Sequence, residues 1–233
     1  MLRSLLCTSV LFVSAISAQD KAKLTHTVRA SGEATVSAKP DRAQITIAVL
    51  TQASTAQAAS AKNATQTTDV LAAVKRTLGV NGQVTTTGYS IAPDYQYSRD
   101  GSPAKVIGYN ATNTVLVTVD DLSLVGKIID SATSAGANNI NNIAFMLRND
   151  EPVRAQALAE AAGKARASAE AIAKALNLPV VGIMNAEATE APTVRPMFAQ
   201  VRATAQVNAG APTPIETGTL DVHAGVVVTL QVQ

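Results

Sequence analysis

The sequence predicts an α+β fold, with mixed or antiparallel sheets formed from hairpins and packed against long alanine-rich helices. Several runs alternate apolar and polar residues, which is the period of a half-buried strand. Other segments place apolar residues at three- and four-residue steps, as amphipathic helices do. The predicted strands and helices do not alternate regularly, which disfavours a doubly wound parallel sheet. Hydrophobic residues make up 47% of the 233-residue chain, enough to bury a core.

The first 18 residues have the pattern of a secretory signal peptide. Arg3 supplies the positive charge, residues 5–15 are almost uncharged and mostly apolar, and Ser17 and Ala18 are small residues before a polar segment. This apolar run is about half of the roughly 20 residues that cross a bilayer as a helix. We therefore expect cleavage after Ala18, export to the periplasm and one mature domain over residues 19–233, with association at the outer membrane left open.

The single cysteine, Cys7, lies within this leader. Lipid attachment to it is disfavoured, because Leu5 and Leu6 stand where small residues would be needed. Removal of the leader leaves a mature chain without disulfides, thiolate nucleophiles or thiolate metal ligands. The stability of the exported chain must then come from packing.

The first part of the mature chain predicts a hairpin followed by a helix. Residues 25–38 alternate strictly, residues 39–42 (Lys-Pro-Asp-Arg) have turn chemistry, and a second alternating run begins at Ala43. Residues 54–78 then change to the helical period, and Gly79 follows at a position suited to a C-cap. We expect this helix to pack on the hairpin.

A second hairpin with a long tip is predicted from residues 83–97 and 107–119, because both runs are strand-like and a polar break separates them. Asp120 or Asp121 can cap a short helix that ends at Gly136. One more strand is expected over residues 138–147.

The most pronounced helical pattern runs from Asp150 to Leu176, with Pro152 in its first turn. Pairs of opposite charge stand four residues apart, Glu160 with Lys164 and Glu170 with Lys174. The many alanines allow a close approach to a sheet. The predicted buried stripe consists of Leu158, Ala161, Ala165, Ala169, Ile172 and Leu176.

The C-terminal part predicts a strand that begins over residues 180–184 and a final strand over residues 220–232, which can return to pair with an earlier one. Between them, residues 191–217 contain four prolines and few large apolar residues. Such a segment buries too little surface to offset its ordering entropy, so we expect a mobile insert.

Taken in order, the patterned segments resemble the SIMPL-domain family of exported bacterial proteins, which includes periplasmic immunogenic and oxidative-stress-defence proteins. The segments that carry the resemblance are residues 28–33, 36, 38–43, 90–95, 107–109, 121–122, 134–137, 143–145, 157–162, 165–170 and 222–228. The chain departs from the family pattern at Ser31, where a second glycine is common, and in the insert at 191–217. The resemblance implies an exported α+β protein, with some members linked to envelope or oxidative stress and some forming homo-oligomers.

The net charge and the absence of known motifs argue against most classes of enzyme and of nucleic-acid-binding or nucleotide-binding protein. A formal net charge of +2 leaves no basic field for nucleic acid, and no Gly-x-Ser-x-Gly or P-loop motif occurs. We assign no catalytic, cofactor-binding or metal-binding residue and expect no cofactor. The residues considered and given structural roles are the histidines His26 and His223, the helix-surface segments Ser60–Lys62 and Ser168–Glu170, and the helix-start acids Asp120, Asp121, Asp150 and Glu151.

The least ordinary cluster is a set of four tyrosines around the second hairpin, Tyr89, Tyr95, Tyr97 and Tyr109. Tyrosines on strands usually cover a sheet edge or join an interface, and lining a ligand pocket is the alternative. Met197 and Phe198 form an apolar pair in the insert that can pack locally or meet a membrane, a partner or another copy. The sequons at Asn63 and Asn110 are interpreted as chance matches.

The first functional hypothesis is a non-enzymatic exported SIMPL-type protein that acts in envelope maintenance or oxidative-stress protection, through self-assembly or protein contacts. The alternative is an exported small-ligand-binding protein or enzyme with a pocket near the tyrosine hairpin. An adhesive surface protein is a third option.

Overall fold

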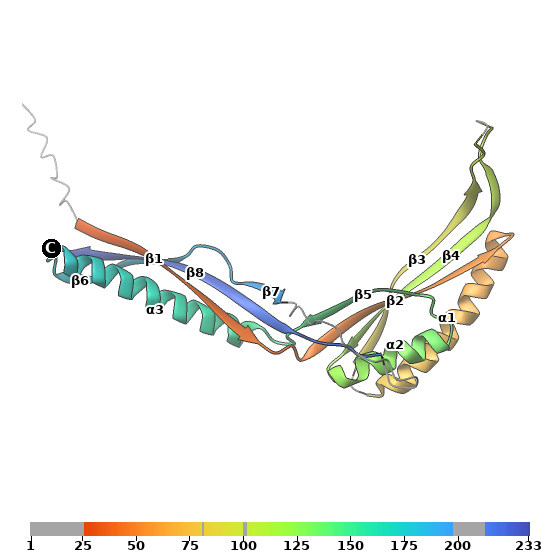
Figure 1. The fold of residues 1–233 in the computed structure, drawn as a ribbon, viewed down its shortest axis with the longest axis horizontal. Helices are drawn as coiled ribbons and strands as arrows, with labels where there is room; N and C mark the ends of the chain where they lie inside the picture. The colour runs from red at the N-terminus through yellow and green to blue at the C-terminus, as the bar shows by residue number, and fades with distance from the viewer. Residues whose placement is uncertain (1–25, 81, 100–101, 198–212) are drawn as a thin grey trace, which may run out of the picture.

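The computed structural model describes residues 26–80, 82–99, 102–197 and 213–233. These residues form two four-stranded antiparallel sheets, one in each of two lobes of an elongated, curved molecule (Figure 1). The predicted α+β class is confirmed. The predicted leader, residues 1–18, lies outside the described residues.

The first lobe, called here the α3 lobe, is a sheet covered on one face by a long helix. Its strands are β1 (His26–Ala38), β8 (Thr219–Val232), β6 (Val180–Ala188) and β7 (Thr193–Met197), and its helix is α3 (Glu151–Ala175). The central strand is β8, which pairs with β1 on one side and with β6 and β7 on the other. The closing strand therefore returns to the start of the chain, as the sequence predicts.

The second lobe, the α1 lobe, is a sheet with two helices on one face. In spatial order its strands are β3 (Gly82–Gln96), β4 (Lys105–Val119), β2 (Arg42–Ala53) and β5 (Asn139–Met146), and its helices are α1 (Ala56–Leu78) and α2 (Val125–Ser134), the latter preceded by a 3-10 turn at Leu122–Leu124. The β3–β4 hairpin, the helix that ends before Gly79 and the strand near 138–147 are confirmed. Each lobe has its own apolar core.

The predicted first hairpin is wrong. β1 pairs with β8, whereas β2 pairs with β4 and β5 in the other lobe. Residues 39–41 carry the chain from one sheet to the other instead of reversing it (Figure 1). The alternation of apolar and polar residues shows which face of a strand is buried, but it does not identify the strand that pairs with it. Two alternating runs joined by turn residues are therefore not sufficient to predict a hairpin.

The contact between α3 and the sheet depends on small residues. The helix buries alanines at four-residue steps, and a Cβ added at Gly32 of β1 would lie 2.3 Å from the backbone nitrogen of Ala165. The predicted close approach is confirmed. The predicted stripe is confirmed at its three alanines and wrong at its three larger residues, because Ile172 and Leu176 are exposed and Leu158 is only partly buried. Larger side chains would hold the helix away from the sheet. The buried residues are Ala157, Ala161, Ala165, Ala169 and Ala173.

The predicted charge pairs on α3 also differ from those observed. Glu170 pairs with Arg166 at 2.7 Å rather than with Lys174. Lys164 donates from Nζ to the backbone carbonyl of Glu33 on β1, at 3.0 Å, rather than pairing with Glu160. Glu170 thus forms an i,i+4 pair with the basic residue four positions before it instead of the one four positions after it, whereas Lys164 has a tertiary partner. An i,i+4 pair stabilises a helix by only about 0.2–0.5 kcal/mol, so either outcome costs little.

The expected mobile insert is partly wrong. Residues 193–197 form β7, which pairs with β8, and its Val194 packs against the core of the α3 lobe. An edge strand tolerates proline, which is why the Pro-rich composition was misleading. Thr213 donates from Oγ1 to Asp130 of α2 at 2.6 Å, and Ile215 packs on the core of the α1 lobe. Residues 198–212, including Phe198, lie outside the described residues.

Candidate functional site

The β3–β4 hairpin extends beyond the rest of its sheet as a two-stranded arm. β2 ends at Ala53, opposite Tyr109, so residues 105–108 of β4 are paired with β3 alone. Figure 1 shows this hairpin curving away past the end of α1. We call residues 89–99 and 102–109 the arm, which includes this two-stranded part and its base at residues 89–92, where the sheet still has three strands. A two-stranded hairpin without a third strand is marginally stable by itself, so the base of the arm must be anchored.

Two polar contacts anchor the base of the arm. The Tyr89 hydroxyl lies 2.8 Å from Ser60 Oγ on α1, and Gln52 Nε2 on β2 donates to Asp94 Oδ2 at 2.6 Å. Ser60 therefore has a structural partner. Because side chains alternate along a strand, Ile91 and Tyr95 lie on the same face as Tyr89.

Beyond these anchors the arm exposes aromatic and aliphatic side chains. Tyr95 and Tyr97 are 46% and 78% exposed, and their ring centroids are 6.4 Å apart. Tyr109 is half-buried. The four tyrosines do lie on one hairpin, and a group of large exposed apolar side chains on one element marks a contact site. The exposed large hydrophobic residues of the arm are Tyr89, Ile91, Tyr95, Tyr97, Val106 and Ile107.

Two hollows lie elsewhere on the surface, and neither is lined by a tyrosine. The larger, of about 800 Å³, includes Thr35, Lys164, Arg195 and His223. Thr35 Oγ1 lies 2.8 Å from His223 Nδ1, so a hydroxyl from the neighbouring strand holds this exposed ring. The hollow mixes cationic, acidic and hydroxyl groups, and it is open to solvent.

The two histidines cannot share a metal ion. His26 pairs with Val232, whereas His223 pairs with Thr35, nine positions along the same strand. At about 3.3 Å per residue the two histidines are roughly 30 Å apart. Both are exposed. Within the described residues, no group of three or more His, Cys, Asp or Glu side chains is placed to hold a metal ion.

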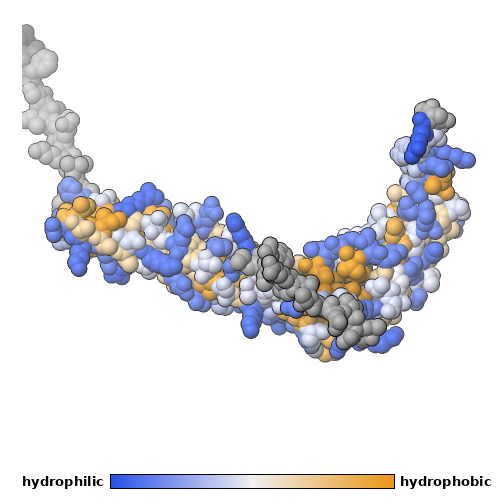
Figure 2. All heavy atoms as spheres, viewed as in Figure 1, coloured by the Kyte–Doolittle hydropathy of each residue, from blue (hydrophilic) through white to orange (hydrophobic). Residues whose placement is uncertain are grey.

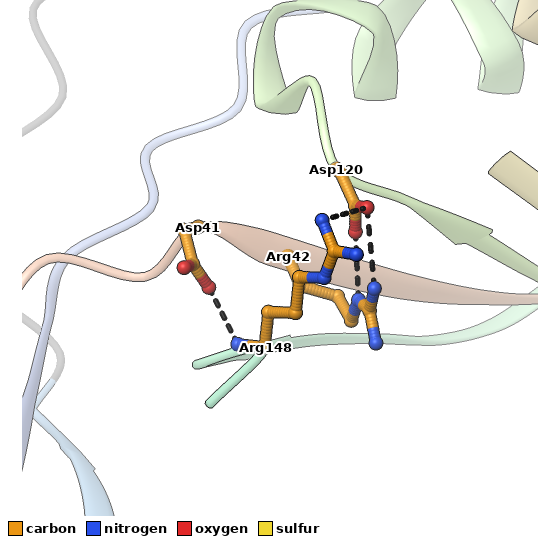
Figure 3. A network of polar contacts seen from close by, with 4 residues as sticks. All are labelled: Asp41, Arg42, Asp120 and Arg148. Atoms are coloured by element: carbon orange, nitrogen blue, oxygen red, sulfur yellow. Dashed lines mark hydrogen bonds and ion pairs between the residues drawn. The ribbon is translucent and has the colours of Figure 1, made fainter. Parts of the chain in front are cut away.

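A polar network lies where the chain passes between the lobes (Figure 3). Arg42, the first residue of β2, donates from Nε to Asp120 Oδ1 at 2.7 Å and from Nη2 to Oδ2 at 3.2 Å. Arg148 Nη1 lies 3.7 Å from the same carboxylate, and its backbone nitrogen donates to Asp41 at 2.6 Å. The network joins the start of β2, the end of β4 and the exit of β5. It also lines the smaller hollow, of about 580 Å³.

The predicted capping roles of the acidic residues are only partly correct. Asp121 caps the 3-10 turn by accepting from the backbone nitrogen of Ser123, but Asp120 is an ion-pair partner of Arg42. Asp150 occupies the N-cap position of α3, yet its carboxylate pairs with Arg154 at 2.7 Å instead of capping. The hydrogen bond from Arg42 holds the pKa of Asp120 below its ordinary value, and the Arg154 hydrogen bond lowers the pKa of Asp150.

The Asp120 pair predicts a specific pH dependence. Because its pKa is lower in the folded protein, the stabilisation is complete above the ordinary carboxyl pKa, near 4, and is lost as pH falls through the folded value. Asp120→Asn should have a lower Tm than the parent protein at pH 6 and a shallower loss of Tm towards pH 2.5. Thermal unfolding at a series of pH values measures this, and parallel curves would show that the pair does not contribute.

The remaining candidates have structural surroundings. Ser168 and Glu170 lie on the exposed surface of α3, as predicted. Asn63 is fully buried and donates from Nδ2 to two backbone carbonyls, so this sequon is inaccessible in the folded chain. Asn110 is half-buried within β4. Met197 is the last residue of β7. None of the helices in the described ranges is long and apolar enough to span a bilayer.

Comparison with known proteins places the chain in a family. The SIMPL family model, described as "Protein of unknown function (DUF541)", matches residues 28–230. The chain belongs to the SIMPL family. It is 29% identical over 242 residues to the "26 kDa periplasmic immunogenic protein" of Brucella melitensis biotype 1, covering 97% of this chain and 95% of the relative. The protein of the same name from Brucella abortus strain S19 gives the same identity and coverage.

A shorter match extends over part of the chain. The "Uncharacterized protein YggE" of Edwardsiella ictaluri is 30% identical to this SIMPL protein over 145 residues, which is 62% of this chain and 60% of that protein. The resemblance found from sequence patterns is thus confirmed over both lobes.

Sequence reasoning missed two features of this SIMPL protein. The Arg42–Asp120 pair joins residues 78 positions apart, and no local spacing signals it. The exposed apolar residues where α3 ends were predicted to be buried or were not singled out, because periodicity suited both the large residues and the neighbouring alanines, and only the alanines face the sheet.

Proposed function

We propose that this SIMPL protein is a non-enzymatic periplasmic protein that acts in envelope maintenance or oxidative-stress protection through protein contacts, including contacts between copies of itself. Two relatives that align over nearly the whole chain are named as periplasmic, and the sequence predicts a secretory leader. The acidic residues singled out from the sequence support a structural role, since Asp120 and Asp150 are engaged by arginines.

The proposal that this protein acts through protein contacts rests on the exposed apolar side chains of the arm. Tyr95, Val106 and Ile107 are 41–53% exposed at the end of a hairpin that has no third strand among the described residues. Burying aromatic and branched side chains against a partner would stabilise both the contact and the arm. A surface of this kind favours protein association over a ligand pocket, because the arm projects from the lobe (Figure 1) and neither hollow is lined by its residues.

The edge strand of the same hairpin supports the proposal. β3 is 15 residues long and lies at the edge of its sheet, so one side of its backbone is open to another strand. The other lobe differs, because at its edge strand β1 the backbone carbonyl of Glu33 already accepts a hydrogen bond from Lys164 Nζ. Between the two register shifts of β3, the stretch from Tyr89 to Ala92 has an open edge and presents Tyr89 and Ile91 on one face. A strand can add there, up to Pro93, which has no N–H to donate.

A deletion strain tests the role in the cell. Challenged with oxidants and membrane stress, it should be more sensitive than the parent, and the full chain should restore resistance. A chain lacking residues 1–18 should not restore it, and neither should an exported Tyr95→Ser/Val106→Ser/Ile107→Ser variant. Rescue by the leaderless chain would contradict a role outside the cytoplasm, and full rescue by the arm variant would contradict the contact surface.

Binding of a small ligand is a second candidate, favoured by the larger hollow at His223 rather than by the tyrosines. A specific ligand must raise Tm by mass action. Thermal-shift screening of the mature chain with metal ions and envelope metabolites tests this. A shift that disappears in Thr35→Val or Arg195→Ala would favour ligand binding.

A further inference from the structure

Six large hydrophobic side chains are exposed at the outer end of the α3 lobe. The chain leaves α3, turns through Asn177 at a positive φ of 55° and enters β6 at Val180, so the last turn of the helix and the first residues of β6 are neighbours. Figure 2 shows apolar residues at this end of the molecule. The α3–β6 patch consists of Ile172, Leu176, Val180, Val181, Ile183 and Met184, each 43–61% exposed.

The patch is exposed because α3 does not extend over β6. The helix packs on β1 and β8, where Gly32 and the alanines let it approach closely, and it has few contacts with β6. Ile183 pairs with the buried Leu230 and so faces the helix side of the sheet, yet it is 55% exposed. Exposed apolar groups on this scale mark a contact with a protein or a membrane.

The position of the N-terminal end of β1 favours a membrane over a protein as the partner of the α3–β6 patch. His26, the first residue of β1, pairs with Val232, and Val232 also pairs with Val180. The patch and the start of β1 therefore lie at the same end of the lobe (Figure 1). Seven residues, 19–25, separate β1 from the predicted leader, and they can span at most about 25 Å. In the uncleaved precursor, the predicted leader would tether this end of the folded lobe within that distance of the bilayer.

The charges around the patch are complementary to an anionic surface. Lys174, in the last turn of α3, forms no ion pair within the described part of the chain, whereas Glu170 is neutralised by Arg166. The segment 19–25 adds Lys21 and Lys23 against one acid, Asp20. Exposed hydrophobic residues flanked by lysines suit the interface of a bilayer that contains anionic lipids.

From these observations we propose that the α3–β6 patch docks the exported protein on the surface of an anionic phospholipid bilayer. Ile183, Met184 and their neighbours enter the boundary between headgroups and acyl chains, and Lys174 faces the headgroups. The proposal is independent of the arm, which lies at the opposite end of the molecule (Figure 1). It assigns the two ends of the protein to different partners, with lipid at one end and protein at the other.

Sedimentation with lipid vesicles tests the proposal on the mature chain, residues 19–233. We expect binding to vesicles of equal phosphatidylglycerol and phosphatidylcholine, and much weaker binding to phosphatidylcholine alone. Ile183→Ser/Met184→Ser should weaken the binding at least about tenfold, since it removes two exposed apolar side chains. The matched control, Leu50→Ser/Val80→Ser, removes exposed apolar side chains of the other lobe and should stay within about twofold.

Lys174→Glu provides a second variant that leaves the apolar residues intact. It should weaken binding to the anionic vesicles about fivefold or more, with only a small loss of Tm from the acidic charge at the C-terminal end of α3. Absence of binding by the parent chain, or an equal loss in the patch variant and its control, would overturn the proposal. So would a lower molar mass of Ile183→Ser/Met184→Ser in light scattering, because a second copy would then be the partner of the patch.

Discussion

Gly32→Ala is expected to lower the free energy of unfolding by about 2–3 kcal/mol, although it adds a single methyl group. The added Cβ would lie 2.3 Å from the Ala165 nitrogen and 2.4 Å from the Ala161 carbonyl oxygen, and both atoms belong to the α3 backbone. No side-chain rotation can relieve such a contact, so α3 must move away from β1. Urea unfolding followed by circular dichroism measures the loss.

Gly163→Ala is the matched control for this substitution. Gly163 lies on the same helix, but a Cβ there would meet nothing within 4 Å. Alanine in an exposed helical position should raise stability by roughly 0.5–1 kcal/mol. Similar effects of the two changes, or a Gly32→Ala protein as stable as its parent, would contradict the close contact between helix and sheet.

Asn63→Ala is expected to destabilise the α1 lobe by about 2–3 kcal/mol, against the usual preference of helices for alanine. Asn63 is fully buried in α1 and donates from Nδ2 to the carbonyls of Val49 at 2.8 Å and Ala111 at 3.0 Å. Its Oδ1 accepts from Thr67 at 3.3 Å. The substitution would remove these three hydrogen bonds from buried polar groups and open a small cavity between α1 and the sheet.

Asp69→Ala serves as the comparison, because Asp69 is an exposed residue of the same helix. Its effect should lie within about 0.5 kcal/mol of zero. Thermal and urea unfolding of both variants gives the difference. Equal free energies of unfolding for Asn63→Ala and Asp69→Ala would show that the hydrogen bonds from the buried amide to β2 and β4 do not stabilise the packing of α1.

Local patterns were sufficient to locate the elements and insufficient to pair them. Residues 25–38 and 219–232 alternate because each strand has one buried face, and that signal was visible. The pairing of β1 with β8 joins the two ends of the described chain, and no local feature encodes it. The helix α3 was located from its cap and period, but its orientation depends on Gly32 in a strand more than 100 positions away.

The two exposed apolar surfaces, on the arm and at the end of α3, also combine features that local sequence predicts with features that only the folded lobes determine. The tyrosines of the arm could be grouped from the sequence because they occupy one hairpin, whose geometry is local. Whether they are covered depends on where β2 and α1 end, which is a property of the assembled lobe. The same holds for Ile172 and Leu176, which have helical spacing suited to a core but are exposed, whereas Ala169 and Ala173 of the same helix are buried against the sheet.

The most direct test of a protein that works through its surfaces is light scattering on the mature chain, residues 19–233, over a wide concentration range. We expect assemblies larger than a monomer, with a molar mass that rises with concentration. Tyr95→Ser/Val106→Ser/Ile107→Ser should shift the population to monomer with Tm unchanged, because these side chains are exposed in the single chain. A strict monomer at high concentration, or unchanged assembly of the arm variant, would contradict association through the arm.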